Sequence, residues 1–193
     1  KNARVIDPAA QIDGVADILA SSGKIEKTGK GLACPGAAVI DASGMIAAPG
    51  FIDLHTHLRE PGREDKETIA SGTRAAVHGG FTAVCCMPNT EPAIDNPGSV
   101  KAVADIAARA AACAVFVIGA ITRGREGKEP ADLKGMRREG IVAVSDDGSS
   151  VEDAEVMLKA LKEARREGIP VIAHCEDAKL SADGHVVVIH DAT

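Results

Sequence analysis

The sequence predicts an α/β fold in which helices cover a parallel β-sheet, with a small β-rich segment in front of it. From Phe51 onward, apolar strand-like runs alternate with amphipathic helical stretches, and the runs are apolar almost throughout. The 193 residues are 45% hydrophobic and 26% charged, which is typical of globular proteins and excludes disordered and low-complexity classes. A (β/α) barrel and an open, doubly wound sheet would both give this pattern.

Residues 1–47 differ from the rest of the chain. The short β-rich pieces ARVID, ADILA, GKIEKTG and AAVIDASG are separated by Gly, Asp and Ser, which predicts a small sheet. The pattern changes at Ala48-Pro49-Gly50. We therefore expect two domains, residues 1–47 and residues 48–193.

Strands and helices are expected to alternate after this boundary. The predicted strands are Phe51–His55, Phe81–Met87, Ala114–Gly119, Ile141–Ser145, Pro170–His174 and His185–His190. The predicted helices are Glu67–His78, which ends at a glycine pair suited to a C-cap, Ser99–Ala112, Ala131–Arg138 and Val151–Glu167. Only CEDAKLSADGH separates the last two strands, whereas a parallel crossover needs about a dozen residues. We expect a missing segment between about residues 176 and 186.

Composition limits the partners and the compartment. The 22 basic and 28 acidic residues give a net charge of −6, and the chain has three Phe but no Tyr or Trp, which argues against nucleic acid and anionic membranes. The start, KNARVIDPAAQIDG, lacks the apolar core of a signal peptide. The five cysteines form no CxxC pair, and an odd number does not favour a disulfide framework. We expect reduced thiols and a cytoplasmic protein.

Side chains that can bind a metal stand at the ends of several predicted strands. In a strand, positions i and i+2 share a face, so His55 and His57 can turn both imidazoles to one ion. Active sites of β/α barrels gather at the carboxyl ends of the strands, which predicts convergence on zinc or a similar ion. Taken singly, a histidine is usually a hydrogen-bonded or surface residue, and Asp-Gly is usually a turn. The candidates are His55, His57, Asp146, Asp147, His174 and His190, with Asp147 as the bridging carboxylate of a binuclear site.

Longer motifs resemble a known family. The stretches GFIDLHTHLREPG, KETIASGTRAAVHGGFTAVCCMPNTEPAID, SDDG and AHCED together resemble the dihydroorotases of the amidohydrolase superfamily, over essentially the whole chain. The resemblance implies a (β/α)8 TIM-type barrel, incomplete in this chain, with residues 1–47 as part of a small N-terminal β-sandwich. Six strands cannot close such a barrel, so we expect a piece of a longer polypeptide that neither folds well nor catalyses alone.

The resemblance also assigns roles to individual residues. It implies zinc, one or two ions, held by His55, His57, Asp147, His174 and His190. Asp147 rather than Asp146 matches the bridging position, which is a carboxylated lysine in related hydantoinases, and VIHDAT departs from the family's usual context for His190. Arg59 and Asn89 match the pair that binds the carboxylate of orotate. The alternative for Arg59 is a surface ion pair with Glu60 or Glu64.

The implied activity is the reversible, metal-assisted hydrolysis of dihydroorotate to N-carbamoyl-aspartate in pyrimidine biosynthesis. In the family an aspartate at the end of strand eight protonates the leaving nitrogen, and we expect that residue to lie beyond Thr193, so this chain supplies no general acid. Two alternatives remain open. One is a hydantoinase or allantoinase; the other is a non-catalytic subunit that scaffolds aspartate carbamoyltransferase, which a catalytic subunit could also bind. A homo-oligomer is expected.

The remaining candidates have structural interpretations. His78 lies at a helix end, where a cationic side chain suits the helix dipole, and His185 begins a strand. Cys85, Cys86 and Cys175 are expected to serve in packing. The charged loop Thr122–Pro130 is expected to be solvated, although a loop on this face of a barrel can line the site.

Overall fold

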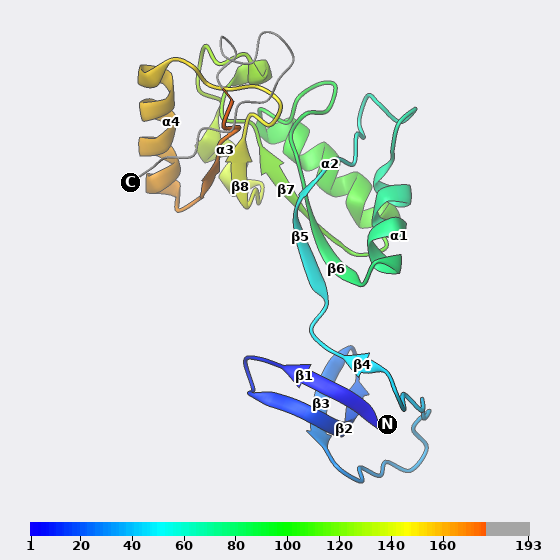
Figure 1. The fold of residues 1–193 in the computed structure, drawn as a ribbon. Coiled ribbons are helices and arrows are strands. Elements are labelled where there is room, and N and C mark those ends of the chain that lie inside the picture. Colours follow the sequence, from blue (N-terminus) through cyan, green and yellow to red (C-terminus); the bar gives the residue numbers. More distant parts are fainter. Residues whose placement is uncertain (177–193) are drawn as a thin grey trace. The chain divides into compact units, whose positions relative to one another are not determined.

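The chain divides into two compact units, Lys1–Gly50 and the residues from Phe51 onward. A computed structural model describes residues 1–176 (Figure 1). The predicted strand His185–His190, the candidate ligand His190 and nearly all of the segment predicted to be interrupted lie outside the described residues.

The first unit is a four-stranded mixed sheet in the order β3-β2-β1-β4. Its strands are β1 (Ala3–Asp7), β2 (Ile12–Ser21), β3 (Lys24–Gly29) and β4 (Ile46–Ala47). Strand β2 is antiparallel to both β1 and β3, and β4 runs parallel to β1. Ser22 and Gly23, which join β2 to β3, both have positive φ, as a type I′ hairpin turn requires.

One predicted strand piece is absent from this sheet. The stretch AAVIDASG, residues 37–44, forms no strand, and β4 begins only after it. The Asp41 side chain explains the difference, because it accepts hydrogen bonds from the Asn2 amide and from the backbone N–H and hydroxyl of Ser43. Such local side-chain bonds compete with strand pairing.

The second unit contains a five-stranded parallel sheet in the order β5-β6-β7-β8-β9. Its strands are β5 (Phe51–Thr56), β6 (Phe81–Cys86), β7 (Ala114–Gly119), β8 (Ala143–Ser145) and β9 (Val171–Ile172). Its helices are α1 (Ile69–His78), α2 (Pro97–Ala110), α3 (Leu133–Arg138) and α4 (Ala154–Glu167), with a 3₁₀ turn, η1, at Arg123–Arg125.

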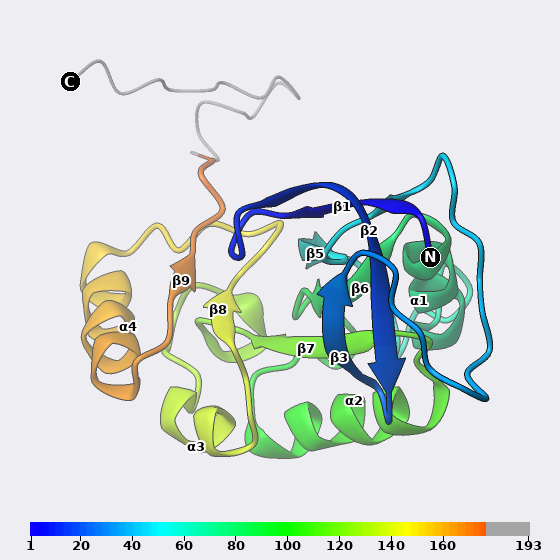
Figure 2. The ribbon, with the colours of Figure 1, turned by 90° about the horizontal axis from the view of Figure 1, so that it is seen from below.

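Sequential strand order distinguishes the two architectures that the sequence left open. A doubly wound sheet reverses its strand order at a switch point, whereas here each strand pairs with the next along the chain. Right-handed crossovers in one direction put all helices on one face, and the helices flank the outer side of the curled sheet (Figure 2). The described part is therefore a half-barrel.

Helix starts are set by capping side chains. Thr68 and Asn96 each form a capping box with the serine three residues later, so α1 begins at Ile69 and α2 at Pro97. Asp153 accepts hydrogen bonds from the N–H groups of Glu155 and Val156, and α4 begins after it. Each helix thus starts a few residues away from the position that apolar periodicity alone predicts.

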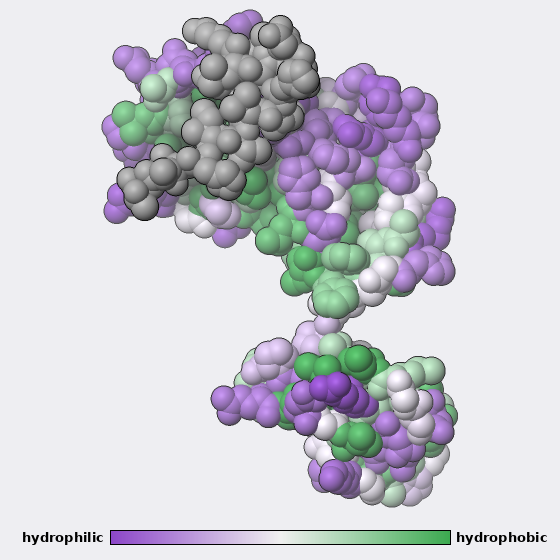
Figure 3. Space-filling view, in the orientation of Figure 1, coloured by the Kyte–Doolittle hydropathy of each residue, from purple (hydrophilic) through white to green (hydrophobic). Residues whose placement is uncertain are grey.

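The two faces of the parallel sheet are covered differently. The main core lies between the sheet and the helices, and its fully buried members include Val84, Val100, Val144, Met136 and Ala160. The inner face carries a smaller cluster and an apolar hollow of about 460 Å³. The hollow is lined by Ile52, Leu54, Cys85, Phe116, Ile118, Val142, Ala143, Pro170 and Ile172. Figure 3 shows apolar residues at the surface over β5, where Phe51, Ile52 and Leu54 are exposed.

Within the described residues, none of the helices has the length and apolar character that crossing a membrane demands.

Candidate metal centre

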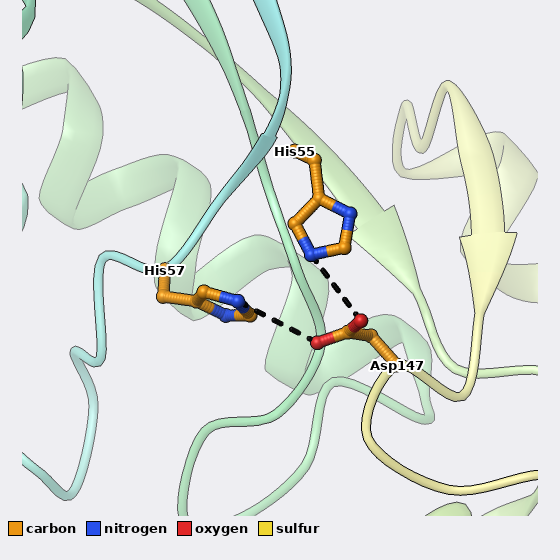
Figure 4. Close-up of side chains that lie close together, drawn as sticks. All are labelled: His55, His57 and Asp147. Carbon is orange, nitrogen blue, oxygen red and sulfur yellow. Dashed lines mark ion pairs between the residues drawn. The ribbon is translucent and has the colours of Figure 1, made fainter. Parts of the chain in front are cut away.

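Two histidines at the end of β5 face a carboxylate from a strand three places away in the sheet. His55 lies in β5 and His57 directly follows it. The Nε2 atom of His55 is 3.2 Å from Oδ1 of Asp147, and that of His57 is 3.6 Å from Oδ2 (Figure 4). The two rings meet edge to face, with centroids 5.1 Å apart. One carboxylate therefore lies between two imidazoles, each facing one of its oxygens.

Asp147 reaches this position from the turn after β8. The turn is closed by a hydrogen bond of 2.7 Å from the Ser149 N–H to the Asp146 carbonyl, and Gly148 has a φ of +78°. That left-handed conformation favours glycine, so the Asp-Asp-Gly sequence is also what the turn requires. The Asp147 side chain is 13% exposed, whereas that of His55 is 48% exposed. The carboxylate is thus nearly enclosed while one imidazole remains open to solvent.

Asn89 joins two members of this group. Its Nδ2 donates to Oδ2 of Asp147 at 2.9 Å, and its Oδ1 lies 3.1 Å from Nδ1 of His57. An ionised carboxylate only accepts hydrogen bonds, so the amide must present its NH₂ to Asp147 and its oxygen to His57. His57 then carries its proton on Nδ1, which leaves the lone pair of Nε2 available. This is the tautomer that a metal-binding histidine needs when its other nitrogen donates to a neighbour.

Asp146, the neighbour of Asp147, points elsewhere. Its carboxylate is buried and accepts hydrogen bonds from the N–H groups of Ile121 and Thr122, at 2.8 and 3.1 Å, and from the Thr122 hydroxyl. Burial raises the pKa of this carboxyl, and the three hydrogen bonds act in the opposite direction. The structure therefore gives the two adjacent carboxylates different partners, with Asp146 bonded to the loop after β7 and Asp147 facing the two imidazoles.

The predicted ligand His174 has a different neighbour. It follows β9, and its Nε2 lies 2.6 Å from Oε2 of Glu176. Among the described residues, the group of candidate ligands within 4.8 Å of one another consists of His55, His57 and Asp147. A role for His174 stays a prediction, as does the role of His190.

Arg59 lies in the loop after β5, two residues beyond His57 in the sequence. Its φ of +60° shows that the extended conformation of β5 does not continue through Arg59. Neither predicted ion pair forms: Glu60 accepts from the Ile69 N–H, and Glu64 accepts from the Gly62 N–H. Within the part of the chain that the structure describes, the half-buried Arg59 side chain has no hydrogen bond or ion pair.

The other histidines and thiols that could take part in chemistry stand apart. His78 lies in the last turn of α1. Cys85 and Cys86 are buried in β6, and burial raises the pKa of Cys86 to about 12. Cys175 is exposed, contrary to the packing role expected for it. Sequence reasoning missed Arg125, whose Nη2 donates to the Asp147 carbonyl at 2.7 Å. The sequence feature that could have indicated Arg125 is its position in the loop after a predicted strand, where barrel enzymes place functional residues.

The donor set fits a divalent cation. Two imidazole nitrogens and a carboxylate oxygen are the usual ligands of catalytic zinc, and each lies about 2.0–2.2 Å from the ion when bound. Ligand atoms that share one ion are then at most about 4.4 Å apart. The observed spread of up to 4.8 Å therefore closes with side-chain adjustments of a few tenths of an ångström.

Comparison with known proteins decides the family. The model of the family described as dihydro-orotase-like matches residues 44–191. The chain belongs to the dihydro-orotase-like family. The dihydroorotase of Elusimicrobium minutum is 51% identical over 184 residues, and that of Aquifex aeolicus is 50% identical over 181 residues. These matches cover 95% and 94% of this chain, and 43% of each relative.

Solved structures similar to this dihydro-orotase-like chain carry other names. A D-hydantoinase matches with a TM-score of 0.76 at 26% identity, covering 95% of this chain and 42% of its own. A D-hydantoinase from a Thermus species matches with a TM-score of 0.74 at 29% identity, covering 95% and 41%. The chain thus spans less than half the length of the relatives that it matches.

Proposed function

We propose that the protein to which these residues belong is a dihydroorotase, which hydrolyses the ring of dihydroorotate to N-carbamoyl-aspartate and closes it in reverse. The observation that carries this proposal is an identity of about half over 95% of the chain to proteins named dihydroorotase. The convergence of His55, His57 and Asp147 supports it, because amide hydrolysis at neutral pH needs an activated water.

The proposed metal is zinc, as one or two ions. His55, His57 and Asp147 would hold it, with His174 and His190 as further proposed ligands and Asp147 as the bridging group. When bound, such a cation would polarise the carbonyl of the substrate and lower the pKa of water, so that hydroxide is available as the nucleophile near neutral pH. Asn89 accepts a hydrogen bond from Nδ1 of His57 and so keeps the proton on that nitrogen. The unprotonated Nε2 then has its lone pair available for a cation.

Substrate capture is proposed for Arg59 and Asn89. A guanidinium grips a planar carboxylate through two parallel hydrogen bonds, and the Arg59 side chain has no competing partner among the described residues. Asn89 is oriented by two members of the candidate metal group, so its amide is fixed before a substrate arrives. The two residues follow neighbouring strands, β5 and β6.

The finer architecture is also a proposal. We propose that residues 48–193 contribute the first part of a (β/α)8 barrel and that residues 1–47 contribute to a small β-sandwich. A general acid would then come from a later strand. The cytoplasmic location, a homo-oligomer and a complex with aspartate carbamoyltransferase remain predictions from the sequence.

A hydantoinase activity is the second candidate, because the similar solved structures bear that name. Two features favour dihydroorotate. The chain has Asp147 at the position that the resemblance gives to a carboxylated lysine in hydantoinases. Arg59, which has no partner among residues 1–176, suits an anionic substrate. A non-catalytic scaffold is less favoured, because the three candidate ligands are present and already converge.

Turnover of three substrates tests the proposal. The protein expressed from its complete gene is expected to hydrolyse dihydroorotate, with hydantoin and allantoin turned over at least about 100-fold more slowly. The His55→Ala variant is expected to lose metal and activity, while His78→Ala, a histidine in the last turn of α1, keeps both. Activity on hydantoin alone, or a metal-free protein that zinc does not activate, would reject the proposal.

A further inference from the structure

The loops after β7 and β8 are joined by hydrogen bonds that run in both directions. The Asp146 carboxylate, after β8, accepts from Ile121 and Thr122, after β7. In return Arg125, after β7, donates from Nη2 to the Asp147 carbonyl at 2.7 Å and to the Ser149 hydroxyl at 3.4 Å. We call these contacts of Asp146, Thr122 and Arg125 the loop clamp.

We propose that the loop clamp is a positioning device that aims the Asp147 carboxylate at His55 and His57 and thereby sets the metal affinity of the site. This inference rests on the proposed metal-dependent function. It concerns residues that the family resemblance does not assign, and none of the three clamp residues is among the converging ligands.

The geometry makes Asp147 dependent on its neighbours. Asp146 is anchored through its side chain, and Asp147 through its backbone carbonyl, so the peptide between them is fixed on both sides. With the backbone fixed, only the side-chain torsions of Asp147 remain free to change the position of its carboxylate relative to the imidazoles. Freeing the backbone would allow the carboxylate to leave the position 3.2 Å from His55.

Burial makes the clamp stiff. Thr122 is completely buried and Asp146 is 1% exposed, so water does not replace their hydrogen bonds. The Thr122 hydroxyl donates to Asp146 and accepts from the Gly127 N–H at 2.9 Å, which ties the charged loop back to the clamp. The same loop is also bonded to the connection between β6 and α2, because the Gly124 N–H donates to the Asp95 carboxylate at 2.8 Å.

Metal affinity measured without substrate tests the inference. In the protein expressed from its complete gene, the Asp146→Asn and Thr122→Val variants are expected to raise the zinc dissociation constant by about 10- to 100-fold. The probe is Zn²⁺ alone, in competition with a chromogenic chelator. Thr122→Ser keeps the hydroxyl and is expected to stay within about two-fold of the wild type.

Asp153→Ala is the matched control, because Asp153 is also an aspartate that accepts two backbone N–H bonds but lies at the start of α4. It is expected to lower the denaturation midpoint, because the start of α4 loses its cap, and to leave zinc affinity within about two-fold of the wild type. If Asp146→Asn does not fold, Thr122→Val decides.

Zinc affinity in Thr122→Val equal to that of Thr122→Ser would overturn the inference, as would a wild-type protein that binds no Zn²⁺. A wild type that binds no Zn²⁺ rejects the inference together with the proposed function, whereas failure of the dihydroorotase assignment alone gives a different result. In that case the wild type binds zinc and the clamp variants weaken it, while dihydroorotate is not hydrolysed.

Discussion

At the candidate site, the orientation of each side chain's polar atoms determines which groups it can bind. Asn89 illustrates this point, because one amide serves a carboxylate at one end and an imidazole at the other. Arg59 is the opposite case, since it is half-buried and has no partner in the described chain. A guanidinium in that state is available to an incoming anion without first breaking an ion pair.

Arg59→Ala is therefore expected to raise the KM for dihydroorotate by about 10- to 100-fold while zinc binding is retained, because a charged bidentate contact is lost. Arg59→Lys keeps the positive charge but not the planar guanidinium, so its KM should lie between that of the wild type and that of Arg59→Ala. Arg74→Ala, at an exposed arginine of α1, is the control in steady-state kinetics. Equal KM values in all three variants would contradict the role of Arg59.

Thiol reactivity should follow burial and pKa. Cys86 has a pKa raised to about 12 by burial, whereas Cys34 and Cys175 are exposed. The thiolate is the reactive form, so iodoacetamide at pH 8 is expected to label the two exposed cysteines first and Cys86 only after unfolding. Peptide mapping by mass spectrometry measures the order. Since the folded state holds the Cys86 proton more tightly than the unfolded state, this group lowers stability as the pH rises above the ordinary thiol range.

At the scale of elements, the loops that carry the site are tied together across neighbouring strands. The Glu91 N–H, after β6, donates to the Pro61 carbonyl, after β5, at 3.0 Å. Gly62 lies at this crossing with a φ of +96°, and a Cβ there would come within 2.0 Å of the Glu91 carbonyl oxygen. The backbone approach therefore requires glycine.

Gly62→Ala is expected to lower the free energy of unfolding by about 2 kcal/mol or more, because both the clash and the left-handed φ oppose any side chain. It should also raise KM, since the two loops carry Arg59 and Asn89. Gly14→Ala is the control, because an added Cβ there meets nothing within 4 Å. Chemical denaturation of both variants measures the difference, and equal stabilities would show that the crossing adapts to a side chain.

Elements were predicted well where apolar runs decide them and poorly where side-chain hydrogen bonds do. The strand Ala114–Gly119 was predicted with its observed bounds, because it is apolar throughout. The start of α2 was misplaced, since Asn96 caps the helix before its apolar periodicity begins. The convergence of His55 with Asp147 was predicted from strand ends. The contact of Asn89 with Asp147 was not predicted, because it depends on the direction in which the amide side chain points, which the order of strand ends does not fix.

At the scale of the molecule, the inner face of the half-barrel exposes apolar residues around a hollow. Phe116 and Ile118 alternate with Val115 and Val117 along β7, and the first pair lines the hollow while the second packs with the main core. Phe116 is 42% exposed there. In a closed barrel, side chains from all strands fill the interior, so the proposed barrel would bury Phe116 completely.

Phe116→Asp distinguishes a closed barrel from an open half-barrel in the protein expressed from its complete gene. A closed barrel places the new carboxylate in a packed interior, so the variant is expected to lose at least about 3 kcal/mol of unfolding free energy. Ala104→Asp, on the exposed face of α2, is the control and should cost less than about 1 kcal/mol. Denaturant titration compares the two. A cost for Phe116→Asp no larger than the control would mean that the hollow stays open to water, and the barrel proposal would then fail.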